Sequence, residues 1–148
     1  MFGDKNLWII SVVVAAIGAL DSLYLAWSKL FNQPVFCGPY GGCETVNSSR
    51  YAEVGGIPIA ILGLGAYLLI LVFLLLENSD GMWREYSPYL VFGISLGGFL
   101  YSIYLTYLEL AVIHSICLYC VLSAIAITIL FILSIPRLLR PQAETYPN

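Results

Sequence analysis

The stretch IPIAILGLGAYLLILVFLLL, residues 57–76, runs for 20 residues without a charged side chain. A helix needs about 20 apolar residues to cross the ~30 Å hydrocarbon core of a bilayer. Three further stretches reach this length, at residues 7–27, 89–110 and 116–135. Their apolar runs are continuous, whereas the strands of a membrane barrel alternate over about 10 residues. The sequence therefore predicts an all-α integral membrane protein, a four-helix transmembrane bundle that forms a single domain over residues 1–148.

The composition of the whole chain leads to the same class. Of its 148 residues, 60% are hydrophobic and 10% are charged, and the mean hydropathy is +0.89. Soluble domains have about 45–50% apolar and about 25% charged residues. Disordered chains have low hydrophobicity. The composition therefore excludes both a soluble globular domain and a disordered chain. The net charge of −3 provides no basic surface for nucleic acid. Four spans with their connections fill the chain, so we expect no second folded domain.

The connections between the spans contain helix-breaking residues. Residues 28–56 form a long, glycine-rich first connection, Ser87-Pro88 is expected to end the second connection, and Pro136 is expected to end the fourth span. Four basic residues lie on the side of the termini and two on the other side: Lys5, Arg84, Arg137 and Arg140 against Lys29 and Arg50. The positive-inside rule then predicts cytoplasmic termini, with the long first loop on the extracytoplasmic face of the cell membrane.

The four cysteines of the chain all fall on or near that outer face. Cys117 and Cys120 form a C-x-x-C that opens the fourth span, and Cys37 and Cys43 flank a glycine-rich segment of the first loop. Residues at i and i+3 share a helix face, and both a helix N-terminus and a C-x-x-C spacing lower thiol pKa. One mobile and one fixed pair suggest a thiol–disulfide relay. Static structural disulfides and a structural zinc site are the alternatives from spacing alone.

Other polar residues in or near the spans are candidates of lower rank. Asp21 lies inside the first span, where we favour a structural hydrogen bond over a proton-transfer role. His114, just before the C-x-x-C, is expected to be solvated, although it is suited to proton transfer. Glu109 is expected to be an interfacial acid at the end of the third span. Tyr101 and Tyr104 are candidates to line a pocket within that span.

Small residues in the second and third spans are assigned to close helix packing. They are Ala60, Gly63, Gly65 and Ala66 in the second span, and Gly93, Gly97 and Gly98 in the third.

An ordered set of motifs spans most of the chain. The first span contains Asp21-Ser22-Leu23-Tyr24-Leu25. The cysteine pair of the loop is followed by Ser48-Ser49-Arg50-Tyr51. The second span opens with Gly56-Ile57-Pro58, and the fourth opens with the C-x-x-C at 117–120. As a set, these motifs resemble the vitamin K epoxide reductase family, specifically its microbial homologues.

The resemblance implies a four-helix bundle around a bound quinone of the menaquinone or ubiquinone type, and an enzyme that oxidises thiols and reduces the quinone. It implies that Cys120 reacts with the quinone and that Cys117 is its partner. Cys43 would form a transient disulfide with Cys117, and Cys37 would exchange with an external thiol protein. Ser49 matches a serine near the quinone site.

Two departures from the family pattern restrict what is carried over. Vertebrate members have a tyrosine four residues after the second cysteine of the C-x-x-C, whereas this chain has Ala124 there. Contacts to vitamin K epoxide are therefore not carried over. Many microbial members also carry a fused thioredoxin-like domain, and this chain ends at Asn148, so the expected redox partner is a separate thioredoxin-like protein. We expect a metal-free oxidoreductase that supports disulfide bond formation, and the alternative is a non-enzymatic four-span protein with structural disulfides or zinc.

Overall fold

Four long helices run side by side in the computed structural model, which describes residues 4–31, 33, 45, 50, 53–78 and 81–139. They are α1 (Asp4–Leu30), α3 (Ile59–Leu76), α4 (Met82–Leu108) and α5 (Leu118–Leu139). Each is long and apolar enough to cross a membrane. The predicted four-helix membrane bundle is confirmed, and we describe the chain as a multi-pass membrane protein.

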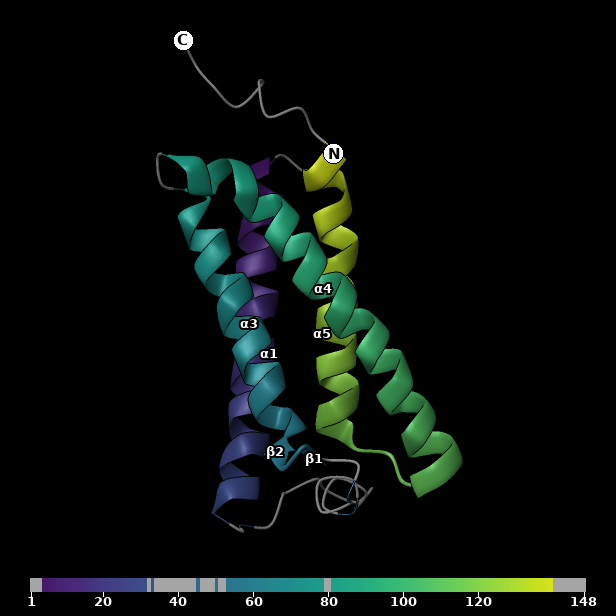
Figure 1. Ribbon diagram of the computed structural model, residues 1–148. Helices are drawn as coiled ribbons and strands as arrows, with labels where there is room; N and C mark the ends of the chain where they lie inside the picture. Colours follow the sequence, from purple (N-terminus) through teal and green to yellow (C-terminus); the bar gives the residue numbers. More distant parts are fainter. Residues whose placement is uncertain are drawn as a thin grey trace.

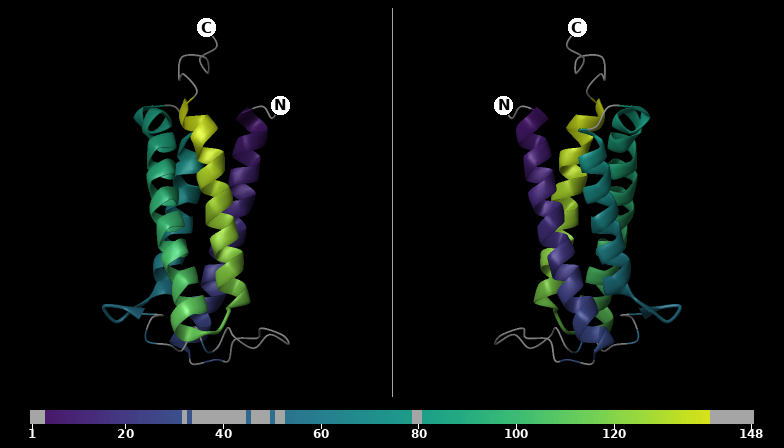
Figure 2. Two further views of the ribbon diagram at one scale, coloured as in Figure 1. Left: turned by 90° about the vertical axis from the view of Figure 1, so that its right-hand side faces the viewer. Right: turned by 90° about the vertical axis from the view of Figure 1, so that its left-hand side faces the viewer.

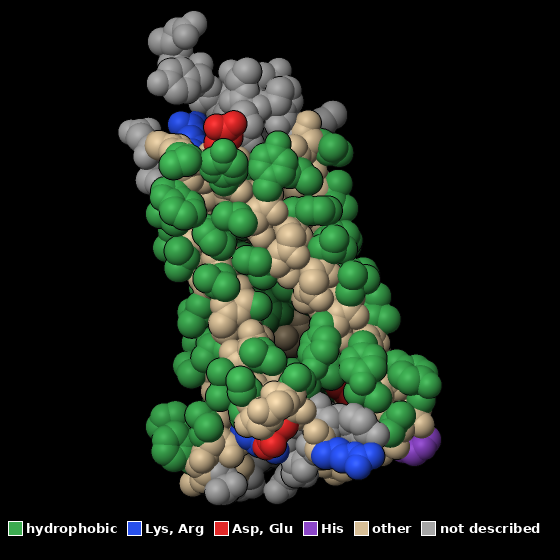
Figure 3. All heavy atoms as spheres, in the orientation of Figure 1, with side chains coloured by type: hydrophobic (Ala, Val, Ile, Leu, Met, Phe, Trp, Pro, Cys, Tyr) green, Lys and Arg blue, Asp and Glu red, His purple; other side chains and the backbone are tan. Residues whose placement is uncertain are grey.

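The two ends of the bundle differ in what they carry. The start of α1 and the end of α5 lie together at one end (Figure 1). The opposite end carries a hairpin of β1 (Glu53–Val54) and β2 (Ile57–Pro58), which projects sideways from the bundle at the start of α3 (Figure 2). On the face shown in Figure 3, apolar side chains cover the length of the helices and charged side chains gather at the two ends.

The hairpin explains why α3 begins two residues later than the predicted span. Ile57 pairs with Val54 and Pro58 with Glu53 in an antiparallel register. The turn between them is Gly55-Gly56, with φ values of 60° and 85°. A two-residue turn with two positive φ angles favours glycine, because a side chain there meets its own backbone.

The expected breaks at Pro88 and Pro136 were wrong, because α4 and α5 both continue through their prolines. A proline inside a helix leaves the carbonyl four residues earlier without its backbone donor. A serine lies close to each proline and donates to a carbonyl in the preceding turn. The Ser87 hydroxyl bonds the Trp83 carbonyl and the Ser134 hydroxyl bonds the Phe131 carbonyl, both at 2.6 Å. The carbonyls that lose a donor are those of Arg84 and Ile132, so the serine bonds lie beside the prolines and do not replace the missing backbone bonds.

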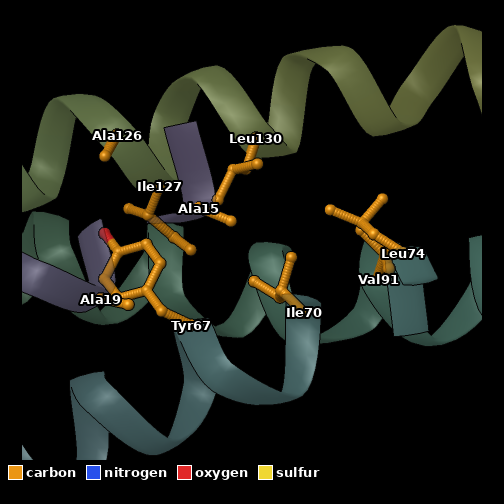
Figure 4. Close-up of a cluster of buried hydrophobic side chains, with 9 residues drawn as sticks. All are labelled: Ala15, Ala19, Tyr67, Ile70, Leu74, Val91, Ala126, Ile127 and Leu130. Carbon is orange, nitrogen blue, oxygen red and sulfur yellow. The ribbon is translucent and has the colours of Figure 1, made fainter. Parts of the chain in front are cut away.

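The core of the bundle combines small residues of α1 with large residues of α3 and α5 (Figure 4). Its buried members are Ala15, Ala19, Tyr67, Ile70, Leu74, Val91, Ala126, Ile127 and Leu130. Gly18 allows α1 to approach α3, since a Cβ at this position would lie 2.3 Å from Cε1 of Tyr67.

The packing roles predicted for glycine are confirmed at only some positions. A Cβ at Gly98 would lie 2.8 Å from Cγ1 of Ile127, and one at Gly63 would lie 3.2 Å from the Ser22 hydroxyl. The other three predicted positions were wrong, because a Cβ there would meet nothing within 4 Å: Gly65, Gly93 and Gly97. Their helix faces point into open space in the described structure.

Polar contacts fix the end of the bundle that lies away from the hairpin. Arg137 of α5 forms an ion pair with Glu77, just after α3, and the Arg137 side chain is almost fully buried. The indole N–H of Trp8 on α1 donates to the Leu74 carbonyl at 2.8 Å. These contacts connect α1, α3 and α5 at the end remote from the C-x-x-C.

Candidate functional site

The C-x-x-C lies at the N-terminus of α5. Cys117 is the residue just before the helix, and its carbonyl accepts the N–H of Val121 at 3.0 Å. Its sulfur accepts the backbone N–H of Cys120 at 3.3 Å. Cys117 therefore caps the helix with its own side chain, as serine or aspartate does at other helix starts. Both residues are free cysteines, Cys117 fully buried and Cys120 half-buried.

This capping geometry sets the ionisation of Cys117. A hydrogen bond from the Cys120 side chain lowers the pKa of the Cys117 thiol, and the backbone N–H of Cys120 acts in the same direction. Burial and the nearby Glu109 carboxylate oppose this shift. The net lowering favours a thiolate at Cys117, and the thiolate is the form that attacks disulfides.

Glu109, which the sequence predicts to be an interfacial acid, is buried beside the two cysteines at the end of α4. Its side chain is 5% exposed, and its Oε2 accepts the backbone N–H of Cys117 at 3.2 Å. It also hydrogen-bonds with the Cys120 side chain. The local sequence contains no sign of this burial, because the contact joins residues on opposite sides of the α4–α5 connection.

A π-helical turn, η3 (Glu109–Ile113), produces this placement. The Glu109 carbonyl accepts the backbone N–H groups of both His114 and Ser115, which closes the connection onto the end of α4. His114 has left-handed backbone angles, with φ 56° and ψ 32°, and its side chain is exposed as expected. Such π turns occur frequently at functional sites.

Asp21 is also buried, at 6% exposed, but the structural hydrogen bond favoured from the sequence was wrong. Both of its carboxylate oxygens are buried, and neither has a hydrogen-bond partner in the part of the chain that the structure describes. Asp21 lies on α1 near enough to Cys120 and Tyr119 for their charges to interact. The start of α5 thus has a carboxylate on α1 as well as one at the end of α4.

A cavity of about 410 Å³ lies between α3 and α4, with α1 and α5 contributing to its walls. The surface is hollowed between α3 and α4 on the face shown in Figure 3. Most of the lining is apolar, and its polar groups include Cys120, Glu109, Tyr67, Tyr101 and Ser123. This size lies within the ~300–1,000 Å³ range of small-molecule sites, and an apolar wall with a few polar groups is typical of them.

Of the two candidate tyrosines of α4, one lines the cavity and the other does not. Tyr101 lines the cavity, whereas Tyr104 is outside the described lining and is 51% exposed. A step of three residues leaves Tyr104 about 60° around the helix from Tyr101, just outside the stripe of α4 positions that line the cavity.

Tyr67 is a cavity residue that sequence analysis missed. It is 2% exposed, and its hydroxyl donates to the Ser123 carbonyl at 2.7 Å and lies 3.0 Å from the Ser123 hydroxyl. The available signal was a single phenol in an uncharged span, where a hydroxyl needs a partner from another helix.

Three predicted site residues lie outside the described residues: Cys37, Cys43 and Ser49.

Comparisons with known proteins agree with this architecture. The sequence model of the vitamin K epoxide reductase family matches residues 9–135, which include most of each of the four spans and all four cysteines. The chain belongs to the vitamin K epoxide reductase family. A relative is the thiol-disulfide oxidoreductase LTO1 of Arabidopsis thaliana, 33% identical over 124 residues. The match covers 78% of this chain and 32% of LTO1, so the chain spans about a third of that relative's length.

Proposed function

We propose that this protein is a membrane thiol oxidase that passes electrons from protein thiols to a membrane quinone and so supports disulfide bond formation. The observation that carries the proposal is the position of the C-x-x-C, because Cys120 lines the apolar cavity while Cys117 caps the helix beside it. Family membership and the thiol-disulfide oxidoreductase LTO1 support the thiol chemistry.

The cavity suits a quinone as the electron acceptor. A quinone ring is flat and largely apolar, with carbonyl oxygens that accept hydrogen bonds, and its isoprenoid tail is soluble in lipid. The hydroxyls of Tyr101 and Ser123 line the same cavity as Cys120 and are suited to a carbonyl oxygen. The hollow between α3 and α4 is on the apolar face of the bundle, where a lipid tail can leave the cavity (Figure 3).

Electrons reach this cavity through two dithiol exchanges. An external thioredoxin-like protein reduces the Cys37–Cys43 disulfide, Cys43 then exchanges with Cys117, and Cys117 and Cys120 end as a reduced pair. Closing the Cys117–Cys120 disulfide releases two electrons, which convert the quinone to quinol. The lowered pKa of Cys117 supports its role as the exchanging thiol.

The remaining parts of the proposal follow from the sequence and its family. Ser49 is proposed to bind a quinone oxygen or hold the loop, and Tyr104 remains a weaker substrate-contact candidate than Tyr101. The cysteine end is proposed to face the extracytoplasmic side of the cell membrane, with both termini in the cytoplasm. Ala124 lines the cavity with a methyl group, so no phenol is available there for an epoxide.

The test is a quinone reduction assay on the purified protein in lipid nanodiscs, with a small dithiol as donor and a short-chain ubiquinone as acceptor. Wild type is expected to reduce the quinone, and Cys120→Ser is expected to abolish turnover. Cys37→Ser is expected to keep activity with the small dithiol and to lose activity with a thioredoxin-like donor. Turnover by Cys120→Ser would overturn the residue assignment, and an inactive wild type would overturn the function.

A further inference from the structure

The reaction at Cys120 needs a route for a proton as well as for electrons. A thiol in an apolar cavity has little access to water, and a neutral thiol is a poor electron donor compared with a thiolate. The acceptor also has to gain protons on its oxygens. A group that contacts Cys120 and shares its cavity is in position to meet both needs.

Glu109 is such a group. Its carboxylate hydrogen-bonds the Cys120 side chain and lines the same cavity. The backbone N–H of Cys117 holds Oε2 at 3.2 Å, and the carbonyl of Glu109 is fixed by two further N–H groups. A carboxylate has two oxygens, so it can keep the Cys117 bond and still accept a proton from Cys120.

We propose that Glu109 is a catalytic residue that takes the thiol proton of Cys120 and delivers it to the electron acceptor in the cavity. This inference rests on the proposed function, and it adds a proton carrier to the thiol relay. The fixed carbonyl and the Cys117 bond keep the carboxylate at the thiols throughout the reaction. Among the described residues, neither oxygen of the Asp21 carboxylate has a hydrogen-bond partner, and the exposed His114 is outside the described cavity lining.

The step balances in atoms and electrons. The Cys117 thiolate and the Cys120 thiol close to a disulfide, which releases two electrons and the Cys120 proton. Glu109 carries that proton to one quinone oxygen. The second proton, which Cys117 released to water on ionising, returns from water to the other oxygen. The products are the Cys117–Cys120 disulfide and one quinol, with Glu109 again a carboxylate.

A purely structural role for Glu109, as an anchor for the turn before α5, makes a different prediction. Glu109→Gln keeps a side-chain oxygen that can accept the Cys117 N–H but cannot carry a proton. A structural anchor would therefore tolerate this change, and a proton carrier would not. Glu53→Gln is the matched control, because Glu53 is a half-exposed acid of the hairpin at the same end of the bundle.

The experiment is a single-turnover oxidation of the reduced full-length protein in nanodiscs by a short-chain ubiquinone. Glu109→Gln is expected to slow quinol formation by about 100-fold or more, as loss of a general base does. Oxidation of the same dithiol by diamide is expected to stay within about threefold of wild type, since diamide acts from water. Glu53→Gln is expected to match wild type in both reactions.

The pH profile supplies a readout that a structural role would not change. The wild-type rate is expected to fall at low pH, where a base is protonated, and Glu109→Gln is expected to lose this limb and rise with pH as its thiols ionise. The other titratable groups around this end of the cavity are Cys117 and Cys120 of α5, Asp21 and Tyr24 of α1, Tyr67 of α3, Tyr101 of α4 and Tyr119 of α5. Glu109→Gln with a wild-type rate and profile would overturn the proposal.

Infrared difference spectra between reduced and oxidised protein test the same point if Glu109→Gln fails to fold. Asp21 and Glu109 are the two buried acids among the described residues. The proposal predicts a carboxylate band that shifts on oxidation, because Glu109 loses the Cys120 hydrogen-bond donor when the disulfide closes. The same shift in Asp21→Asn as in wild type supports Glu109 as its source, and loss of the shift in Asp21→Asn overturns the proposal. A wild type that reduces no quinone refutes the proposed function instead, which keeps the two failures distinct.

Discussion

Gly18 on α1 lies against the ring of Tyr67 on α3, so Gly18→Ala is an informative structural perturbation. The new Cβ would lie 2.3 Å from Cε1 and 2.5 Å from Cζ of Tyr67. The ring has to retreat by more than about 1 Å to reach the 3.5–4.0 Å separation of carbon atoms in contact. Tyr67 is 2% exposed and its hydroxyl is bonded to Ser123, so a movement of the ring disturbs both its packing and this hydrogen bond.

The expected loss of stability follows from three terms. Overpacking of a core costs about 1–3 kcal/mol, and loss of the Tyr67–Ser123 hydrogen bonds costs about 1 kcal/mol. Alanine favours a helix over glycine by about 1 kcal/mol, which offsets part of this cost. Gly18→Ala is therefore expected to lower the free energy of unfolding by about 1–3 kcal/mol. The assay is reversible unfolding by sodium dodecyl sulfate in mixed micelles, followed by circular dichroism.

A double-mutant cycle separates the ring contact from other effects. In a Tyr67→Leu background the shorter side chain leaves room for the new Cβ, so Gly18→Ala is expected to cost less than about 0.5 kcal/mol. Gly65→Ala is the matched control, because a Cβ there meets nothing within 4 Å and stability is expected to be equal or higher. Additive effects of Gly18→Ala and Tyr67→Leu would refute the assigned contact.

Three further predictions concern the thiols, the cavity and the remote end of the bundle. With the two loop cysteines replaced by serine, Cys120→Ala removes the side-chain hydrogen bond that lowers the pKa of Cys117. The ultraviolet absorbance of the Cys117 thiolate should then appear only at higher pH than in the unsubstituted C-x-x-C, and an unchanged or lower titration would contradict this. Ala124→Tyr puts a phenol into the cavity wall and should raise the KM for quinone at least about tenfold while diamide oxidation is retained; an unchanged KM would place the quinone elsewhere. Arg137→Met leaves Glu77 without its ion-pair partner and should cost about 3 kcal/mol of stability without changing the KM for quinone. Glu77→Leu added to Arg137→Met should restore part of that stability, and no recovery would contradict the pairing.

The sequence predicted the elements that depend on local pattern. Four apolar stretches define the four helices, and the C-x-x-C spacing predicted the two thiols at the start of α5. The helix ends were less predictable, because Pro88 and Pro136 are breakers by local rules and α4 and α5 nevertheless continue through them.

The parts of the site that were missed depend on contacts between distant residues. Glu109 at the end of an apolar span has the local pattern of an interfacial acid, and only the π turn and the backbone N–H of Cys117 bring it into the cavity. Tyr67 bonds Ser123, 56 residues away on another helix. Neither pairing follows from spacing within one element, since it depends on how α3, α4 and α5 pack.

The most direct test of the central claim is a stoichiometric oxidation of the reduced protein under anaerobic conditions, with the two loop cysteines replaced by serine. One equivalent of a short-chain ubiquinone is added, quinol is measured by absorbance, and the disulfides are mapped by mass spectrometry after thiol alkylation. The account predicts one quinol for each Cys117–Cys120 disulfide formed. Quinol without that disulfide, or an intact dithiol that leaves the quinone oxidised, would contradict it.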